Sequence, residues 1–449
     1  MSKGMVIAGA WSGVGKTTIS IGLMSSFIKK GLIVQPFKVG PDYIDPSYHY
    51  FATKRCSRNL DLWMITEDGI KEIFYRASKN ADVSIVEGVM GLYDGSALEI
   101  NTSTSKIAEI LNLPVILIID VTSMGESVSA VAKGFSSMSK NFAGVILNKV
   151  SSDSHKKTCI RALENENIEV FGAIPKEEGI ILEKRHLGLI PGFEKDFNNK
   201  IQKISRIIEE CIDLERILDL SEISPEINYF EEEIDEKDDK KYAVKIGVAF
   251  DKAFNFYYWD NLDLLMRLGA DLKFFSPVRD KQIDVDGLYI GGGFPEVYAN
   301  ELTRNKKMLN LIKELSEEKI PIYGECGGLL YLTNEIEYSE KRFEMVGVFN
   351  ASAKMKDRVT LNYTKGFVIE DNILSRKGDL ILGHEFHYTE IDGVPKNEKF
   401  VYKLTRGKGI TSKKDGWLVN NTLGSYSHLH FYSNKNFAKN FIERCREFA

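Results

Sequence analysis

A cysteine flanked by glycines is the residue of this chain whose surroundings best suit a nucleophile. Cys326 follows the apolar run 320–323, in Gly324-Glu325-Cys326-Gly327-Gly328. A strand-to-helix turn of this kind exposes a nucleophile, and nearby backbone N–H groups can stabilise an oxyanion. Gly292 and Gly293 follow another predicted strand and would complete the oxyanion hole together with Gly327. A buried structural cysteine is the alternative, and the glycines on both sides disfavour it.

A cysteine nucleophile needs a base, and the chain has seven histidines. His428 and His430 lie in the alternating segment 425–431, which as a strand would turn both side chains to one face. His384 and His387 are one residue short of the HExxH spacing of a helical zinc site, so a catalytic metal is disfavoured there. The remaining histidines are His49, which could touch substrate, and His155 and His186, which we expect to be structural or on the surface.

The first apolar run of the chain is followed by a phosphate-binding pattern. Residues 10–17 read Ala-Trp-Ser-Gly-Val-Gly-Lys-Thr, a Walker A sequence with alanine at its first position. Gly13 and Gly15 let backbone N–H groups point at phosphate oxygens, Lys16 would reach the β- and γ-phosphates, and the Thr17 hydroxyl would bind Mg²⁺. A plain glycine turn is the alternative, and Gly-Lys-Thr between a strand and a helix disfavours it. We therefore expect ATP to bind here.

Carboxylates that could complete a Mg²⁺ site follow two further predicted strands. Glu87 ends one strand, Asp42 and Asp45 come just after another, and Asp94 stands close to Glu87 in the sequence. Each acid alone could be a turn or helix-cap residue. However, ligands of open α/β sheets bind at the carboxyl ends of the strands. We assign Thr17, Asp42 and Glu87 to the metal.

These motifs are separated by an alternation of apolar runs and helical patterns. Such an alternation predicts right-handed βαβ units and an α/β fold with a mostly parallel sheet. The expected strands of the first half are 5–10, 32–39, 83–87, 115–120 and 145–148, with a further strand at 169–174. The expected helices include 17–30 and a single closing helix at 201–220.

The composition changes around residues 221–242. The stretch 231–241 holds seven acidic and three basic residues, which is typical of a solvated linker. A second αβ pattern begins at Val244. We therefore expect an ATP-binding domain at 1–222, a charged linker at 223–242 and a second α/β domain at 243–449.

The overall composition limits the classes of partner. The chain has 449 residues, with 59 Lys and Arg against 64 Asp and Glu, and the formal charge of −5 favours neither nucleic acid nor a membrane surface as partner. Five cysteines without a CxxC pair argue against a disulfide framework and against a cysteine-rich zinc site. No apolar run approaches the roughly 18 residues that span a bilayer. We expect a cytoplasmic protein.

Together the motifs resemble the cobyrinate a,c-diamide synthases, glutamine-dependent ligases of cobalamin biosynthesis. The similarity runs over nearly the whole chain and includes the order of the motifs. Residues 38–46, Lys-Val-Gly-Pro-Asp-Tyr-Ile-Asp-Pro, are far more specific than the Walker loop. The other matching stretches are 13–17, 57–61, 86–95, 291–296, 324–328 and 383–388.

The resemblance implies that the N-terminal module is similar to dethiobiotin-synthetase-like enzymes. It would use ATP and Mg²⁺ to phosphorylate a substrate carboxylate. The resemblance places Lys38 among the ATP-binding residues. It implies contacts with the substrate for Asp42, Tyr43, Asp45 and Asp94.

The resemblance also implies that the C-terminal module is a class I glutamine amidotransferase of the cobyrinate and cobyric acid type. It would hydrolyse glutamine through a Cys326 thioester, with His428 rather than His430 as the base. The released ammonia would convert the acyl phosphate to an amide, at the c and a acetate side chains of the macrocycle. The usual orienting glutamate does not follow either histidine by two residues, which agrees with a Cys–His dyad.

Several alternatives stay open from the sequence. The same architecture serves cobyrinate, hydrogenobyrinate and nickel-sirohydrochlorin. The expected partners are therefore a small-molecule tetrapyrrole, glutamine and ATP, and the chain could form a homodimer. A P-loop ATP-switch protein is the alternative from another class. It is disfavoured because Trp11 stands where partition-type ATPases carry a second lysine, and because it would not use Cys326 or His428.

Overall fold

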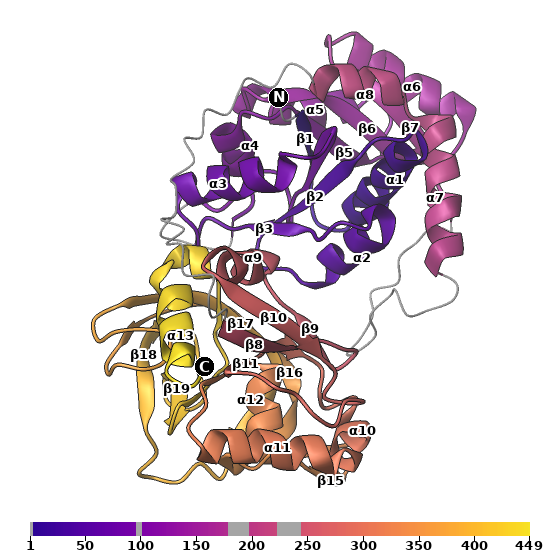
Figure 1. The fold of residues 1–449 in the computed structure, drawn as a ribbon. Helices are drawn as coiled ribbons and strands as arrows, with labels where there is room; N and C mark the ends of the chain where they lie inside the picture. The colour runs from indigo at the N-terminus through magenta and orange to yellow at the C-terminus, as the bar shows by residue number, and fades with distance from the viewer. Residues whose placement is uncertain (1–2, 96–100, 178–196, 222–243) are drawn as a thin grey trace. The chain divides into compact units, whose positions relative to one another are not determined.

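The structure is a computed structural model that describes residues 3–95, 101–177, 197–221 and 244–449 (Figure 1). These residues form two compact units. We call the described residues up to 221 the N-unit and those from 244 onwards the C-unit. The predicted linker at 223–242 and His186 lie outside the described residues.

Parallel β-strands form the centre of the N-unit. Among the described residues, seven strands make one sheet in the order β3-β2-β4-β1-β5-β6-β7, and each neighbouring pair is parallel. The inner strands are almost fully buried, as expected for a parallel sheet covered by helices. The strands are β1 Gly4–Gly9, β2 Val34–Val39, β3 Arg58–Leu60, β4 Val83–Glu87, β5 Val115–Asp120, β6 Phe142–Val150 and β7 Val170–Pro175.

Helices connect these strands, and the first of them packs closely on a much later one. A side chain at Gly22 of α1 would lie 2.4 Å from Ile208 of α7, and the hydroxyls of Ser26 and Ser205 are 3.0 Å apart. Glycine therefore permits the contact that brings α7 onto α1. The helices are α1 Lys16–Lys29, α2 Ile44–Thr53, α3 Glu67–Ser78, α4 Thr104–Leu111, α5 Val128–Met138, α6 Asp153–Glu164, α7 Phe197–Cys211 and α8 Leu214–Ser221.

The single closing helix predicted at 201–220 is wrong. Two helices, α7 and α8, occupy this region and are separated at Ile212 and Asp213. Ile212 forms an antiparallel bridge with Gly172, and the Asp213 N–H donates to the Phe171 carbonyl at 2.9 Å. The chain leaves the helix here because it pairs with β7, which is an edge strand of the sheet and has backbone groups to satisfy.

The C-unit has a larger, mixed sheet. Its parallel part has the order β10-β8-β11-β13-β20, and an antiparallel part continues from β20 through β19 and β18 to the long hairpin of β16 and β17. The parallel strands are β8 Val244–Ala249, β10 Ala270–Phe275, β11 Gly287–Ile290, β13 Ile322–Glu325 and β20 Thr422–Ser425. The others are β9 Phe254–Phe256, β12 Gly292–Gly293, β14 Thr333–Tyr338, β15 Lys341–Glu344, β16 Phe349–Val368, β17 Leu380–Asp392, β18 Phe400–Arg406, β19 Lys414–Val419 and β21 His428–Leu429.

Short helices follow the parallel strands of the C-unit, and a hydrophobic core joins them to the sheet. That core includes Leu288 and Ile290 of β11, Ile322 of β13 and the residues Leu329–Leu332. The helices are α9 Trp259–Arg267, α10 Ala299–Arg304, α11 Lys306–Glu317, α12 Gly327–Leu332 and α13 Asn436–Arg446. The predicted two-module α/β fold with mainly parallel central strands is confirmed.

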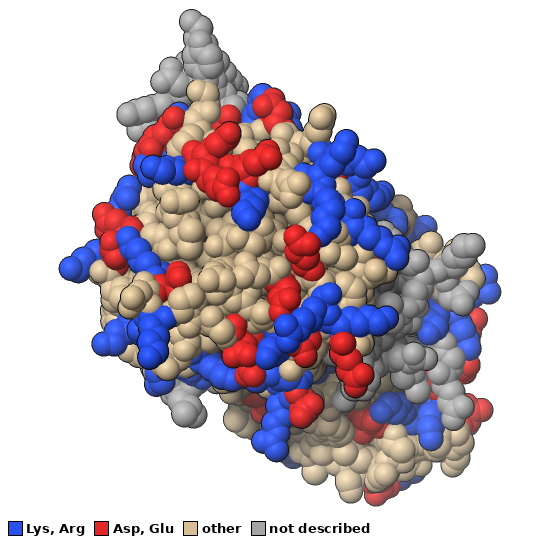
Figure 2. Space-filling model, turned by 90° about the horizontal axis from the view of Figure 1, so that it is seen from below, with Lys and Arg blue, Asp and Glu red and all other residues tan. Residues whose placement is uncertain are grey.

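The outer surface of the protein is mixed in charge where Figure 2 displays it. Lys and Arg side chains are interspersed with Asp and Glu on that face. In the part of the chain that the structure describes, no helix is both long enough and apolar enough to cross a membrane.

Candidate active sites

The Walker loop joins β1 to α1 in the N-unit. Gly13 and Gly15 have φ angles of 86° and 99°, which favour glycine. A side chain at Gly15 would also lie 2.5 Å from the Asn148 amide nitrogen at the end of β6. The Lys16 ammonium donates to the Met90 carbonyl at 2.5 Å. Burial, and then the charge of Lys38, lower the pKa of Lys16 to about 8. The loop therefore has a backbone suited to phosphate, and an anionic ligand would stabilise the charged form of Lys16.

Lys38, at the end of β2, lies among the predicted carboxylates. Its ammonium is 2.5 Å from Asp45 Oδ2, 2.9 Å from Glu87 Oε1 and 4.0 Å from Asp42 Oδ2. Burial alone would lower the pKa of Lys38, but Asp45 and Glu87 raise it above its ordinary value. Asp42 and Asp45, from the stretch 38–46, are thus brought together with Glu87, from the stretch 86–95, around one buried cation.

Glu87 is the most connected of these acids. The Thr17 hydroxyl donates to its Oε1 at 2.7 Å, and His49 Nε2 lies 2.7 Å from its Oε2. Burial would raise the pKa of Glu87, but Lys38 and His49 hold it well below its ordinary value. His49 is itself buried, with its other ring nitrogen 3.0 Å from the Ser57 hydroxyl. His49 therefore contacts Glu87, a partner that the sequence did not indicate.

The remaining predicted residues of the N-unit lie around this cluster. Asp94 Oδ2 accepts from the Gly91 N–H at 3.0 Å, and its charge acts on Lys16. Tyr43 is buried beside the start of α2. Asn59 was not singled out, yet its side-chain amide donates to the carbonyls of Gly40 and Asp42 at 2.8 Å and holds their loop.

The oxygen donors of this site suit Mg²⁺ in kind. Thr17 and Glu87 are in contact, and carboxylate and hydroxyl oxygens are the ligands that Mg²⁺ prefers. Within the described residues, no group of three or more His, Cys, Asp or Glu side chains is arranged to hold a metal ion. The ammonium of Lys38 occupies the position between Asp45 and Glu87. The oxygen donors therefore fit Mg²⁺ in kind, while the Lys38 ammonium pairs with Asp45 and Glu87 in this structure.

Cys326 forms the turn between β13 and α12 in the C-unit. Its φ of 46° and ψ of −98° are strained for a residue with a side chain, as in a nucleophile elbow. The Cys326 N–H donates to the Ser425 carbonyl at 2.7 Å, which ties the elbow to β20. Burial, and then the charge of Glu296, raise the pKa of the Cys326 thiol, whereas the Gly327 N–H lowers it. The thiol is therefore protonated until a base accepts its proton.

Around this elbow the backbone of one loop approaches another loop and His428 so closely that only glycine fits. A side chain at Gly327 would lie 2.9 Å from the Gly293 nitrogen, and one at Gly292 would lie 2.5 Å from His428 Cε1. The structure thus brings the predicted oxyanion glycines together with Gly327 and the predicted base. This is the arrangement expected of a cysteine nucleophile with backbone donors beside it.

His428 opens the short strand β21, which pairs with β17. Its Nδ1 lies 3.8 Å from Glu325 Oε2, and both side chains are buried. Sequence reasoning missed Glu325 because it looked for an acid after the histidine. A glutamate at the end of an otherwise apolar strand was the available signal.

The other histidines of the C-unit have different partners. His430 follows the end of β21 and contacts Asp260 at 3.8 Å. The ring of His384 stacks on that of His428 with centroids 4.8 Å apart. His387 stacks on Tyr426 at 3.7 Å. His428 is therefore the histidine that lies against both Glu325 and the glycine loop.

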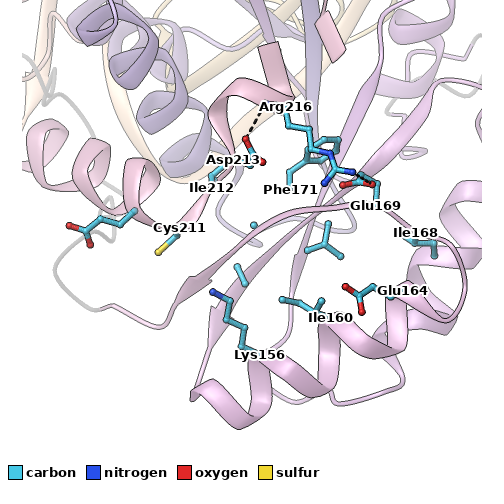
Figure 3. A pocket seen from close by; sticks show the side chains of 14 residues that line it. Lys156, Ile160, Glu164, Ile168, Glu169, Phe171, Cys211, Ile212, Asp213 and Arg216 are labelled. Atoms are coloured by element: carbon cyan, nitrogen blue, oxygen red, sulfur yellow. Dashed lines mark hydrogen bonds and ion pairs between the residues drawn. The ribbon is translucent and has the colours of Figure 1, made fainter. Parts of the chain in front are cut away.

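A cavity of about 540 Å³ in the N-unit is remote from the predicted site in the sheet. It lies beside the amino end of β7 and is lined by residues of α6, α7 and α8 (Figure 3). The Walker loop instead follows the carboxyl end of β1. Arg216 pairs there with Glu169 at 2.8 Å. None of the residues predicted from the motifs lines it.

Two family models match this chain, one in its N-terminal half and one in its C-terminal half. The CobQ/CobB/MinD/ParA nucleotide binding domain matches residues 5–190, and the CobB/CobQ-like glutamine amidotransferase domain matches residues 245–436. A relative from Caldanaerobacter subterraneus subsp. tengcongensis is 43% identical over the full length of both chains and is named cobyrinate a,c-diamide synthase. The chain belongs to the cobyrinate a,c-diamide synthase family. Two archaeal relatives bear the same name: one from Methanobrevibacter smithii is 42% identical over 99% of each chain, and one from Methanococcus maripaludis is 43% identical over 98% of this chain and 99% of its own.

Membership of the cobyrinate a,c-diamide synthase family accounts for both halves of the chain. The N-unit carries the nucleotide-binding domain, which includes the Walker loop. The C-unit carries the glutamine amidotransferase domain, in which Cys326 forms the elbow. The protein is therefore a carbon–nitrogen ligase with glutamine as amido donor, and the ATP-switch alternative is not supported.

Proposed function

We propose that this protein amidates the a and c acetate carboxylates of cobyrinate, using ATP and glutamine. The observation that carries the proposal is the full-length similarity to proteins named cobyrinate a,c-diamide synthase. The geometry of the two units supports it. In the N-unit Thr17 of the Walker loop contacts Glu87, and in the C-unit Glu325, the residue before Cys326, lies 3.8 Å from His428.

The N-unit would activate the substrate. A carboxylate is a poor electrophile, so its oxygen attacks the γ-phosphorus of ATP, the bond to the β–γ bridging oxygen breaks, and an acyl phosphate and ADP form. Lys16 would neutralise the phosphates. Lys38 would contact the transferred phosphoryl group or the substrate carboxylate. Asp42, Tyr43, Asp45 and Asp94 surround this region and would contact the substrate. Bound Mg²⁺ would supply charge neutralisation on the phosphates, held by Thr17, Asp42 and Glu87.

The C-unit would supply the nitrogen. The Cys326 sulfur attacks the side-chain carbonyl carbon of glutamine as His428 accepts the thiol proton. The C–N bond breaks, the proton passes to the leaving nitrogen, and ammonia departs. Water then cleaves the thioester to glutamate. Gly292, Gly293 and Gly327 would stabilise the oxyanion in both steps. Ammonia attacks the acyl phosphate, and the amide forms as phosphate leaves.

The test is to offer the purified protein cobyrinate, hydrogenobyrinate and nickel-sirohydrochlorin, each with ATP, Mg²⁺ and glutamine, and to identify the products by mass spectrometry. The proposal predicts a diamide from cobyrinate. If only one of the other two macrocycles gave a diamide, that macrocycle, and not cobyrinate, would be the substrate. ATP hydrolysis without amidation of any macrocycle would contradict the ligase mechanism.

A further inference from the structure

A buried carboxylate lies behind the predicted base of the C-unit. Glu325 is the last residue of β13 and directly precedes Cys326. Its side chain is fully buried, and its Oε2 is 3.8 Å from His428 Nδ1. The register of β13 on β20, with Glu325 opposite Ser425, brings it close to a histidine about 100 residues later in the chain.

Three donors hold this carboxylate in place. Oε1 accepts the Tyr323 hydroxyl at 2.6 Å and the Leu429 backbone N–H at 3.0 Å, and Oε2 accepts the Tyr289 hydroxyl at 2.9 Å. A buried charge is costly unless donors compensate it. These donors compensate Glu325 and fix its orientation. The bond from Leu429 also ties the carboxylate to the residue next to His428.

The Cε1–Nε2 edge of the imidazole faces the glycine loop. A side chain built on Gly292 would lie 2.5 Å from Cε1 and 3.4 Å from Nε2 of His428. Gly293, the next residue, lies against Gly327 beside Cys326. Nδ1 thus faces the carboxylate, and the Cε1–Nε2 edge faces the glycine loop that lies against Gly327. Catalytic histidines that take a proton from a nucleophile are oriented in this way.

Other titratable groups also face this histidine. His384, from β17, stacks on the ring of His428, and burial together with the charge of His428 lowers the pKa of His384 well below its ordinary value. His384 therefore stays neutral. Tyr289 and Tyr323 face Glu325, and burial raises the pKa of both phenols. The two phenols therefore stay protonated and donate to Glu325 beside Nδ1.

We propose that Glu325 is the positioning residue of His428 and takes the place of the orienting glutamate that class I amidotransferases carry after the histidine. It favours the Nδ1–H tautomer, leaves Nε2 as the proton acceptor, and stabilises the imidazolium after the thiol proton of Cys326 has moved. The inference rests on the proposed hydrolysis of glutamine. The predicted Cys–His dyad thereby becomes a triad whose acid immediately precedes the nucleophile.

The test replaces Glu325 with glutamine in the full chain. Glu325→Gln keeps the shape and an oxygen acceptor, but its NH₂ group can donate to Nδ1 and so favours the wrong tautomer. We expect kcat for glutamine hydrolysis to fall about 10- to 100-fold with KM changed less than about twofold. Amidation driven by added ammonia should be unchanged. Asp260→Asn is the matched control, because Asp260 is also buried but lies 3.8 Å from a different histidine, His430.

A spectroscopic measurement separates positioning from a merely structural role. In protein labelled with ¹⁵N-histidine, His428 should carry its proton on Nδ1 in the wild type and on Nε2 in Glu325→Gln. Tyr289→Phe is a second, milder variant that removes the donor to Oε2 but keeps the charge. We expect it to lower kcat about three- to tenfold at unchanged KM, and it decides the question if Glu325→Gln does not fold.

The outcomes distinguish the two proposals. A wild-type protein that releases no glutamate from glutamine would contradict the proposed function itself. A wild type that hydrolyses glutamine, with a Glu325→Gln variant that keeps its kcat within twofold and its His428 tautomer, would overturn the positioning role alone. A raised KM at constant kcat would also overturn it, because the carboxylate would then act on substrate binding.

Discussion

The Lys38 ammonium lies 2.9 Å from Glu87 Oε1, and both side chains are buried. The ammonium therefore neutralises the carboxylate at the place where a metal-bound nucleotide would need that carboxylate. Lys38 also contacts Asp45, so its removal would leave two buried acids without their cation. The ion pairs of Lys38 thus compensate two buried acids in the ligand-free protein.

Lys38→Met should strongly destabilise the N-unit. Breaking a buried ion pair by removing one partner costs about 3–5 kcal/mol, because the remaining charge is left uncompensated. Urea unfolding should show this loss, and Mg²⁺ should restore part of it in the variant but not in the wild type. Lys29→Met is the control: Lys29 forms an exposed pair with Glu209, which contributes at most about 1 kcal/mol. A Lys38→Met variant as stable as the wild type would contradict the assigned charges.

ATP binding should take up a proton at alkaline pH. The pKa of Lys16 is lowered to about 8, so the ligand-free protein loses this proton as the pH rises through that value. Anionic phosphates favour the charged lysine and raise its pKa again. Calorimetry in buffers of different ionisation enthalpy should show more proton uptake at about pH 9 than at about pH 7. Uptake that persists unchanged in Lys16→Ala would assign it to another group.

Glu87→Gln should weaken the dependence of ATP turnover on Mg²⁺. The substitution removes a charge that contacts Thr17, Lys38 and His49, and the ionised form of Glu87 is strongly favoured in the folded protein. We expect the Mg²⁺ concentration for half-maximal ammonia-driven amidation to rise about tenfold or more. Glu209→Gln, on the surface, is the control. A normal Mg²⁺ titration of Glu87→Gln would remove Glu87 from the metal site.

Glu296→Gln should make Cys326 more reactive. Burial raises the pKa of Glu296 to about 7, and its ionised form raises the pKa of the Cys326 thiol. Removing this charge should lower the thiol pKa, so more thiolate forms at a given pH. We expect alkylation of Cys326 by iodoacetamide, followed on its peptide, to be roughly three- to tenfold faster above about pH 7. Glu301→Gln, on the surface, should not change the rate. Slower alkylation of Glu296→Gln would contradict the inferred effect of Glu296, which is to raise the pKa of the Cys326 thiol.

Features that depend on a few consecutive residues could be predicted from the sequence. The Walker loop, the acids after β2 and β4, and the elbow at Cys326 all carry their signal in a few consecutive residues, and the apolar runs set the α/β fold. The predicted site residues of the N-unit gather at the carboxyl ends of parallel strands, where such sheets bind ligands. Their roles in catalysis stay predictions until variants are measured.

Contacts between distant segments could not be predicted in the same way. Glu325 reaches His428 only because of the register between β13 and β20, and the register of parallel strands leaves no local mark on the sequence. The break between α7 and α8 has a similar origin, since Ile212 has helical spacing but pairs with the edge of β7. Lys38 matched a motif, but its place among three acids depends on the order of strands β2 and β4.

The most direct measurement compares glutamine and ammonia as nitrogen sources for Cys326→Ala with cobyrinate and ATP. The variant lacks the nucleophile of the C-unit but keeps the N-unit intact. Mass spectrometry should find cobyrinate diamide when ammonia is supplied and no amide when glutamine is supplied, whereas the wild type should form the diamide from either. Glutamine-driven amidation by Cys326→Ala, or loss of its ammonia-driven amidation, would contradict the two-site mechanism.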